Sequence, residues 1–205
     1  GDVYKRQVHI DVDPSEINKN VKTDASIIGD MKEVLAILNN KIAKQDNSEW
    51  MSYIAEMKNQ YPLSLDKSKL TGPAVIDSVY NITNGDAIIT TDVGQHQMWA
   101  AQFYKYKAPR QLITSGGLGT MGYGVGACVG SKMGNKDRVC INIAGDGCFR
   151  MNMNELATAA RCGRQLIQIV MNNHVLGMVR QWQTLFYDKP VSYTHLRAHE
   201  TRRHL

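Results

Sequence analysis

The chain has 205 residues, a formal net charge of +5 at pH 7 and hydrophobic residues at 43% of its positions, enough for one full domain and part of another. No apolar run reaches the length of a membrane-spanning helix, and no signal peptide is recognisable. Four cysteines without a CxxC motif favour free thiols in a reducing compartment over a disulfide framework.

Both ends of the sequence match a sequencing adapter. Residues 2–7 correspond to one reading frame of a transposon-end adapter, and residues 191–195 correspond to its reverse complement. We therefore expect 1–7 and 190–205 to be adapter-derived, and we reject His195 and His199 as a metal-binding pair. Residues 1–7 carry a charge of +1 and residues 191–205 carry +2, which leaves +2 for the rest. That charge is too small to indicate a nucleic acid or a membrane as partner.

Residues 8–40 have the pattern of the end of an α/β domain. Residues 8–13 and 25–28 are predicted strands. Each is followed by a helix-start signal, Asp13-Pro14-x-Glu16 and Asp30-x-x-Glu33. Residues 41–71 are polar, contain one amphipathic helix after Ser48 and are expected to form an interdomain linker.

A second α/β domain is expected over residues 72–189. It begins with a helix over 73–80 and a strand over 87–91, and Gly94, Gln95 and His96 follow that strand. Ligands of α/β sheets bind at the carboxyl ends of the strands. Gln95 and His96 could therefore donate hydrogen bonds to phosphate oxygens. The alternative is an ordinary helix cap with a solvated histidine.

A glycine-rich loop follows the next predicted strand, residues 111–114. Gly117-x-Gly119-x-x-Gly122 matches the dinucleotide fingerprint, with Asp137 at a suitable distance. A nicotinamide-binding domain is therefore a rival interpretation. The match is weak by itself, because any tight turn against a ligand selects glycine. No Gly-Lys-Ser/Thr follows a glycine loop, which argues against a P-loop nucleotidase.

Two polar motifs each follow an apolar run. Gly145-Asp146-Gly147 comes after residues 139–144, and Asn172-Asn173 comes after residues 166–171, with 24 residues between the motifs. The apolar runs predict parallel strands, so Asp146 and Asn173 are expected at one sheet edge. A carboxylate and an amide oxygen suit Mg²⁺ holding a diphosphate. Two ordinary strand-to-helix turns are the alternative. The connecting helix is predicted from residues at helical spacing: Met153, Leu156, Ala157 and Ala160.

Together these motifs resemble the thiamine diphosphate enzymes, whose cofactor signature matches Gly145-Asp146-Gly147 … Asn172-Asn173 in residue types and spacing. Within them the chain resembles the large catalytic subunits of acetolactate synthase, on three blocks over residues 93–102, 114–122 and 176–183. The resemblance covers about residues 8–189. It implies an α/β fold, with a parallel-sheet thiamine diphosphate-binding domain preceded by the tail of an α/β middle domain.

The resemblance implies a role for each matching residue. Asp146 and Asn173 would bind Mg²⁺ through their side chains and Val175 through its backbone carbonyl. The diphosphate-binding residues would be Gly94, Gln95 and His96, helped by backbone around Gly145, Gly147 and Cys148. The Gly119 carbonyl would accept a hydrogen bond from the aminopyrimidine, and Met121 would separate the two cofactor rings. Met178, Val179 and Trp182 would line the acceptor pocket, where Trp182 would select the second 2-keto acid.

The implied activity is the condensation of two pyruvates, or of pyruvate with 2-oxobutanoate, with loss of CO₂. The products are 2-acetolactate or 2-aceto-2-hydroxybutanoate, in branched-chain amino acid biosynthesis. In this family a glutamate from an N-terminal domain of the partner subunit protonates the pyrimidine. That domain is not in the sequence, so the chain alone is expected to be inactive.

The implied parent enzyme is a homodimer or tetramer, cytoplasmic, or organellar if the source is a plant or fungus. FAD and a small regulatory subunit stay open as further partners. Two alternatives remain: another thiamine diphosphate-dependent 2-keto acid decarboxylase, carboligase or oxidase, or a non-catalytic cofactor-binding module.

Overall fold

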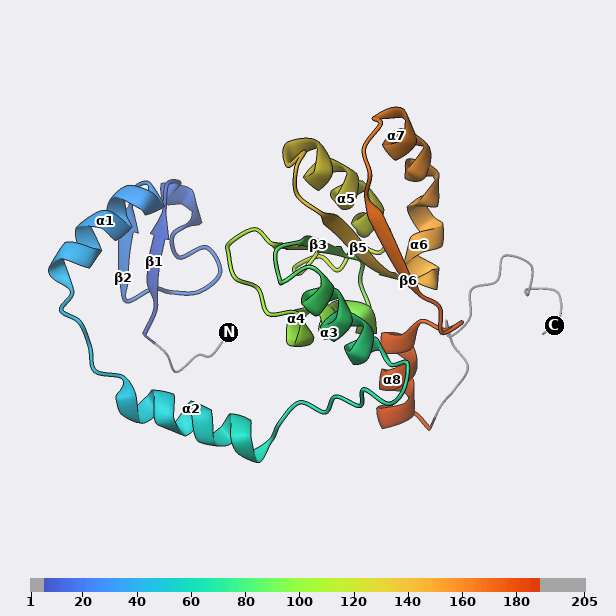
Figure 1. Cartoon of the computed structure of the whole chain (residues 1–205). Helices are drawn as coiled ribbons and strands as arrows, with labels where there is room; N and C mark the ends of the chain where they lie inside the picture. Colours follow the sequence, from blue (N-terminus) through green and yellow to red (C-terminus); the bar gives the residue numbers. More distant parts are fainter. Residues whose placement is uncertain (1–5, 189–205) are drawn as a thin grey trace. The chain divides into compact units, whose positions relative to one another are not determined.

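The computed structural model describes residues 6–188 (Figure 1). The chain forms two compact units, one ending at Leu63 and the other beginning at Ser64. Among the described residues, no helix is long and apolar enough to span a bilayer. Most of the residues predicted to be adapter-derived lie outside the described part, and the predicted domain limits stay predictions.

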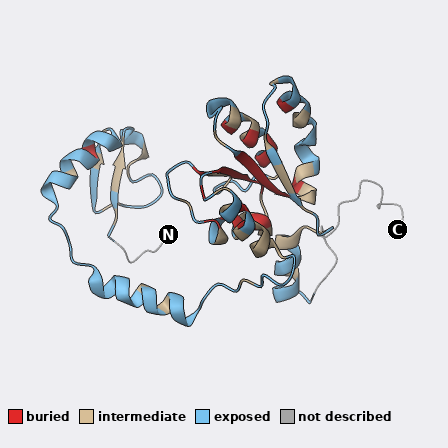
Figure 2. Cartoon of the chain, in the orientation of Figure 1, coloured by how far each residue is buried: buried red, intermediate tan, exposed pale blue. Residues whose placement is uncertain are grey.

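The first unit contains a pair of parallel strands. β1 (Val8–Asp11) pairs with β2 (Ala25–Ile28), and Val8 is opposite Ala25. The pair is followed by α1 (Met31–Lys41) and α2 (Ser48–Gln60). Only Val34 of these two helices is buried (Figure 2).

The two predicted helix starts of this unit differ in outcome. The Asp30 carboxylate accepts hydrogen bonds from the backbone N–H groups of Lys32 and Glu33 and caps α1, as predicted. Asp13 also accepts a bond, from Ser15 N at 2.8 Å, but only the 3₁₀ helix η1 (Pro14–Glu16) follows. The prediction of a full helix there was wrong. A cap and a proline set the first turn, and no apolar stripe follows to stabilise more turns.

The second unit is a four-stranded parallel sheet in the order β4-β3-β5-β6, with helices on both faces (Figure 1). α3 and α4 lie on one face, and α5 and α7 lie on the other. The elements in chain order are α3 (Gly72–Ile82), β3 (Ile88–Thr91), α4 (Gln95–Phe103), β4 (Leu112–Thr114), α5 (Tyr123–Gly134), β5 (Cys140–Gly145), α6 (Asp146–Asn152), η2 (Met153–Glu155), α7 (Leu156–Arg161), β6 (Ile167–Met171) and α8 (Gly177–Phe186).

The segment between β5 and β6 departs from the prediction. A helix begins at once at Asp146, and the 3₁₀ turn η2 separates α6 from α7. This turn changes the phase of the residues that follow it, because 3₁₀ geometry has three residues per turn. Ala159 is therefore the buried residue of α7, whereas Met153, Ala157 and Ala160 are exposed. The predicted inward stripe was wrong.

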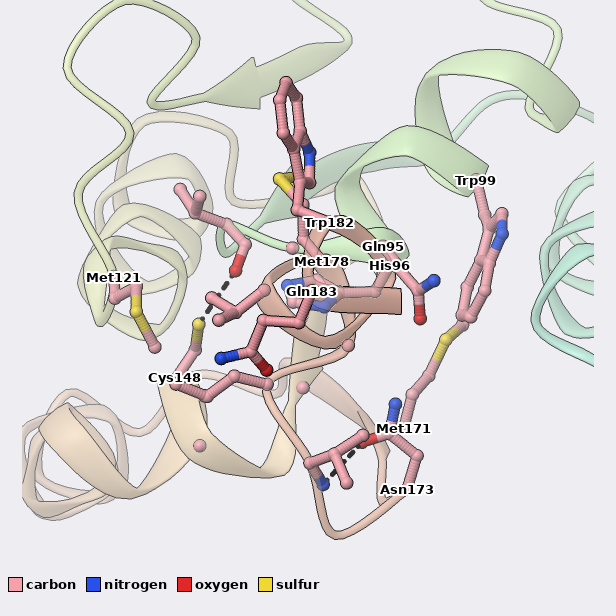
Figure 3. Close-up of a pocket in the computed structure, with 18 of the residues that line it drawn as sticks. Gln95, His96, Trp99, Met121, Cys148, Met171, Asn173, Met178, Trp182 and Gln183 are labelled. Atoms are coloured by element: carbon pink, nitrogen blue, oxygen red, sulfur yellow. Dashed lines mark hydrogen bonds between the residues drawn. The ribbon is translucent and has the colours of Figure 1, made fainter. Parts of the chain in front are cut away.

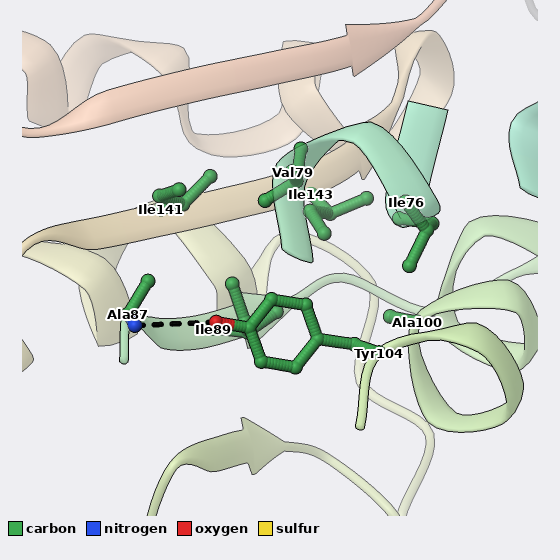
Figure 4. Packing of buried hydrophobic residues seen from close by; sticks show 8 residues of the cluster. All are labelled: Ile76, Val79, Ala87, Ile89, Ala100, Tyr104, Ile141 and Ile143. Atoms are coloured by element: carbon green, nitrogen blue, oxygen red, sulfur yellow. Dashed lines mark hydrogen bonds between the residues drawn. The ribbon is translucent and has the colours of Figure 1, made fainter. Parts of the chain in front are cut away.

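The core lies on both faces of the sheet. β3 is buried at all four positions, as expected for a central parallel strand covered on both sides. Figure 2 shows the buried residues concentrated around this sheet. The cluster on the α3 and α4 side is drawn in Figure 4: Ile76, Val79, Ala87, Ile89, Ala100, Tyr104, Ile141 and Ile143. Ile88, Cys128 and Cys140 form a second cluster beneath α5.

One buried hydroxyl group in this core gives a stability prediction. Tyr104 Oη accepts a hydrogen bond from Ala87 N at 3.2 Å and lies 3.1 Å from Thr83 Oγ1 (Figure 4). We expect Tyr104→Phe to lower the free energy of unfolding by about 1–3 kcal/mol, because the buried Ala87 N–H loses its acceptor. Urea denaturation measures the change. Tyr123→Phe is the control, since that ring is 37% exposed; equal stability of all three proteins would contradict the prediction.

Candidate cofactor site

A pocket of about 370 Å³ lies at the carboxyl edge of the sheet (Figure 3). Its wall combines the segment after β3, the start of α6, the loop after β6 and one side of α8. Twelve of the fourteen residues predicted for the site line it: Gly94, Gln95, His96, Met121, Gly145, Gly147, Cys148, Asn173, Val175, Met178, Val179 and Trp182. Gly119 and Asp146 are not lining residues. The volume falls in the range of small-molecule and cofactor sites.

Strand register brings the two predicted metal-binding side chains to the same edge. Gly145 pairs with Met171, so Asp146 follows one member of the pair and Asn173 lies two residues beyond the other. Asn173 Oδ1 accepts a hydrogen bond from Val175 N at 3.1 Å. An amide oxygen has a second lone pair, which stays available for a cation.

The Asp146 carboxylate fits a cation. Its Oδ1 atom is buried and has no hydrogen-bond partner among the described residues, and such an oxygen is costly unless a donor or a metal satisfies it. Residues 6–188 contain no group of three His, Cys, Asp or Glu side chains placed to hold a metal. One carboxylate, one amide oxygen and one carbonyl are a suitable set for Mg²⁺, which usually keeps waters and substrate phosphates as its other ligands.

The imidazole of His96 is enclosed by two glycines. A Cβ atom on Gly94 would lie 2.8 Å from His96 Cε1, and one on Gly145 would lie 3.1 Å from Nδ1. The side chain is buried, and its Nε2 has no hydrogen-bond partner among the described residues. Burial lowers the pKa of His96 to about 4, against the opposing effects of the Asp92 backbone and the Asp146 charge. A solvated cap histidine is therefore excluded, and His96 is neutral at physiological pH.

This burial predicts a pH dependence of stability. Between pH 4 and pH 6.5 the unfolded chain binds a proton on His96 that the folded chain, with a pKa of about 4, does not bind, so stability falls as the pH falls. We expect His96 to lower the free energy of unfolding by about 2 kcal/mol when the pH falls from 7 to 5. Urea denaturation of the metal-free protein and of His96→Gln at both pH values measures the difference. An unchanged pH dependence in His96→Gln would contradict the prediction.

The Cys148 thiol ties two walls of the pocket together. It donates a hydrogen bond to the Val93 carbonyl at 3.1 Å, which connects α6 to the segment after β3 (Figure 3). Burial, followed by the negative charge of Asp92, raises the pKa of Cys148 to about 11. The thiol therefore stays protonated and acts as a hydrogen-bond donor.

The side chain of Gln95 faces α8. Its Nε2 donates to Gln181 Oε1 at 3.0 Å, and a Cβ atom on Gly177 would lie 2.3 Å from its Oε1. A contribution of Gln95 to diphosphate binding would therefore come from its backbone. α4 begins at Gln95 without a side-chain cap, and unsatisfied N–H groups at a helix start bind anions.

The helix α8 supplies the apolar wall of the pocket. Met178, Val179 and Trp182 line the pocket, and no residue of α8 is buried. Trp182 is 59% exposed and packs against the ring of Phe186, with centroids 5.3 Å apart. Met178, Trp182 and Leu185 share one helical face, a pattern typical of a core stripe, but none of them is buried.

Sequence reasoning missed several lining residues, among them Trp99 and Met171. Trp99 lies against the start of α3, where a Cβ atom on Gly72 would be 2.1 Å from its Cε3. The glycine at position 72 could have indicated this close approach. Because it stands directly before Pro73, the sequence suggests only the start of a helix there. Met171 ends an apolar strand, and in the sequence it cannot be distinguished from a core residue.

Comparison with known proteins agrees with this geometry. Residues 92–202 match the family described as thiamine pyrophosphate enzyme, C-terminal TPP binding domain. The chain is 45% identical to the acetolactate synthase large subunit of Corynebacterium glutamicum over 198 residues, covering 93% of the chain and 32% of the relative. Identity to chloroplastic acetolactate synthase 1 of Nicotiana tabacum is 44% over 200 residues, covering 92% and 30%.

The acetolactate synthase large subunit of Lactococcus lactis is 43% identical over 184 residues, covering 88% of the chain and 32% of the relative. The chain thus spans about a third of the length of the curated relatives it matches. More than half of the chain lies within the family match. This chain therefore belongs to the thiamine pyrophosphate enzymes and contains their C-terminal cofactor-binding domain.

Proposed function

We propose that the chain is part of an acetolactate synthase catalytic subunit, which condenses two pyruvates, or pyruvate with 2-oxobutanoate, with loss of CO₂. The main support is the pocket, which combines an edge bearing Asp146 and Asn173 with an apolar wall bearing Trp182. Identities of 43–45% to proteins named acetolactate synthase agree with this function.

The proposed cofactor is thiamine diphosphate with Mg²⁺. When bound, thiamine diphosphate would supply a thiazolium ring that accepts the electron pair of the bond broken when CO₂ leaves. Asp146 and Asn173 hold the metal with the Val175 carbonyl, and the buried, unpartnered Oδ1 of Asp146 supports this role. The diphosphate is held by backbone N–H groups after Gly94 and around Gly147, beside the neutral imidazole of His96.

The remaining lining residues orient the rings and the substrates. The Gly119 carbonyl and the Met121 side chain hold the two cofactor rings, and Met121 lines the pocket. Met178, Val179 and Trp182 exclude water and shape the space for the second 2-keto acid. The protonated thiol of Cys148 keeps the pocket wall closed through its bond to Val93 and does not compete as a nucleophile.

An acid for the aminopyrimidine has to come from elsewhere in the complete protein. The lining residues of the pocket include no glutamate. We therefore expect the complete enzyme to be a homodimer or tetramer in which the partner subunit supplies this glutamate, and we expect the isolated chain to form no acetolactate. We also expect a cytoplasmic enzyme, or an organellar one if the source is a plant or fungus.

A chimera tests the proposed function. Residues 92–188 would replace the matching segment of the Corynebacterium glutamicum large subunit, and product formation would be measured with pyruvate, with pyruvate plus 2-oxobutanoate, and with glyoxylate. We expect 2-acetolactate and 2-aceto-2-hydroxybutanoate, and no product from the same chimera carrying Asp146→Ala. Acetyl phosphate with oxygen consumption would indicate an oxidase, and a glyoxylate product would indicate a different carboligase. Binding of the cofactor without turnover would indicate a non-catalytic module.

A further inference from the structure

We propose that Asp92 is a positioning residue for the cofactor rings: its carboxylate fixes the turn at Gly122 and thereby the place of Met121 in the pocket wall. The identity of the ligand rests on the proposed function, whereas the control of the turn stands on the contacts of Asp92 alone. Asp92 itself does not line the pocket. Neither the spacing of the motifs nor the resemblance assigns it a role.

Asp92 caps a helix that is distant from it in the chain. It follows β3 and is fully buried, and its Oδ1 accepts a hydrogen bond from Gly124 N at 3.1 Å. The nearby backbone N–H groups of Gly122 and Tyr123 also stabilise its charge and lower its pKa. These are the first groups of α5, which begins at Tyr123. A negative charge at a helix N-terminus is favourable, and these N–H groups have no partner within the helix.

The helix backbone lies directly against the carboxylate. A Cβ atom on Gly124 would be 2.7 Å from Asp92 Oδ2 and 2.3 Å from Asn142 Oδ1. Asp92 Oδ2 is buried and has no hydrogen-bond partner among the described residues. Burial raises the pKa of Asp92, and the backbone N–H groups of Gly124, Gly122 and Tyr123 oppose that effect. Within residues 6–188, the carboxylate is thus oriented by its hydrogen bond to the start of α5.

The turn before α5 is held from two sides. Gly122 has a φ of 86°, in the left-handed region, and its carbonyl accepts a hydrogen bond from Asn152 Nδ2 at 2.8 Å. The Asp92 carboxylate accepts a hydrogen bond from Gly124 N, two residues further along, at the start of the helix that Gly122 precedes. Gly122 is thus fixed by the end of β3 and by α6, the helix that begins with Asp146. Met121 immediately precedes this fixed residue, so its placement in the pocket depends on both anchors.

Hydrogen–deuterium exchange of the full chain tests whether Asp92 sets the turn. We expect amides in residues 118–124 to exchange about tenfold faster or more in Asp92→Asn, the effect of losing a hydrogen bond to a charged group. Thr90→Val is the matched control, because Thr90 is buried beneath the same helix and its Oγ1 donates to the Gly124 carbonyl at 3.3 Å instead of accepting from an N–H group at the start of α5. It should leave exchange at 118–124 unchanged. Asp92→Ser replaces Asp92→Asn if the latter does not fold.

Two ligands test the consequence for the cofactor. We expect Asp92→Asn to weaken binding of thiamine diphosphate with Mg²⁺ about tenfold, while the Kd for inorganic pyrophosphate with Mg²⁺ changes less than twofold. Unchanged exchange at 118–124, parallel changes in both Kd values, or the same loss in Thr90→Val would each overturn the proposal. If the unaltered chain does not prefer thiamine diphosphate to pyrophosphate, the proposed function fails, and the exchange rates still decide whether Asp92 sets the turn.

Discussion

Replacing Asp146 with alanine is expected to weaken Mg²⁺-dependent binding of thiamine diphosphate by about a hundredfold or more. Asp146 supplies the only negative charge in the proposed set of metal ligands, since Asn173 contributes an amide and Val175 a carbonyl. Outer-shell partners of metal ligands already cost about 10–100-fold when removed, so a charged direct ligand should cost at least as much. The loss should be specific to the metal, because Asp146 Oδ1 has no hydrogen-bond partner in the described structure that would be left unsatisfied.

Isothermal titration calorimetry at several Mg²⁺ concentrations measures this loss. Asn173→Ala should weaken binding in the same direction but less, because a neutral ligand is removed. Asn172→Ala is the matched control: Asn172 is the exposed neighbour of Asn173 and does not line the pocket. It should bind the cofactor as the unaltered chain does. Equal affinities for Asp146→Ala and Asn172→Ala would contradict the assignment of Asp146 to the metal.

Gly124→Ala should lower the free energy of unfolding by about 3 kcal/mol. The new Cβ atom would approach buried side-chain oxygens of Asn142 and Asp92 at 2.3 and 2.7 Å. Asn142 is itself held by Thr90 Oγ1 at 3.1 Å and by Gln168 Oε1 at 2.8 Å. Overpacking of this kind costs about 1–3 kcal/mol, and displacing hydrogen-bonded buried groups adds to it.

Gly126→Ala is the matched control for this substitution. It lies in the same helix, and a Cβ atom there would meet nothing within 4 Å. Alanine is favoured over glycine in a helix, so this variant should be more stable by about 0.5–1 kcal/mol. Urea denaturation would measure both variants. The two variants should change the free energy of unfolding in opposite directions. If both are destabilised, the loss in Gly124→Ala does not come from the contacts with Asn142 and Asp92.

The parallel strands of the second unit were predictable because each is a short apolar run ended by polar or glycine residues. β6 and β5 lie within a residue or two of the predicted runs at 166–171 and 139–144. The helices between them were less predictable. The 3₁₀ turn at Met153 lies between two helices that both contact α5, and a local apolar pattern does not contain information on such tertiary contacts. The short η1 shows the same limit, since its capping signal was correct and its length was not.

The part of the site that was predictable is the part that follows from sheet topology, because motifs after neighbouring parallel strands lie at the same edge. Asp146 and Asn173 follow neighbouring parallel strands, so their common edge follows from the strands alone. Contacts between distant elements were not predictable. The hydrogen bond from Gln95 to Gln181 and the one from Gly124 N to Asp92 depend on the tertiary placement of α8 and α5. The glycine loop was also ambiguous in the sequence. Its glycines fit the dinucleotide fingerprint, and the same glycines lie within the segment that matches the thiamine pyrophosphate enzyme family.

A crystal structure of the chain with thiamine diphosphate and Mn²⁺ in place of Mg²⁺ tests the shared metal site most directly. Anomalous scattering locates the ion without reference to the protein. We predict a single ion at about 2 Å from one side-chain oxygen each of Asp146 and Asn173 and from the Val175 carbonyl, with diphosphate oxygens among its other ligands. An ion bound elsewhere, or side-chain oxygens of these two residues too far apart to share it, would contradict the account.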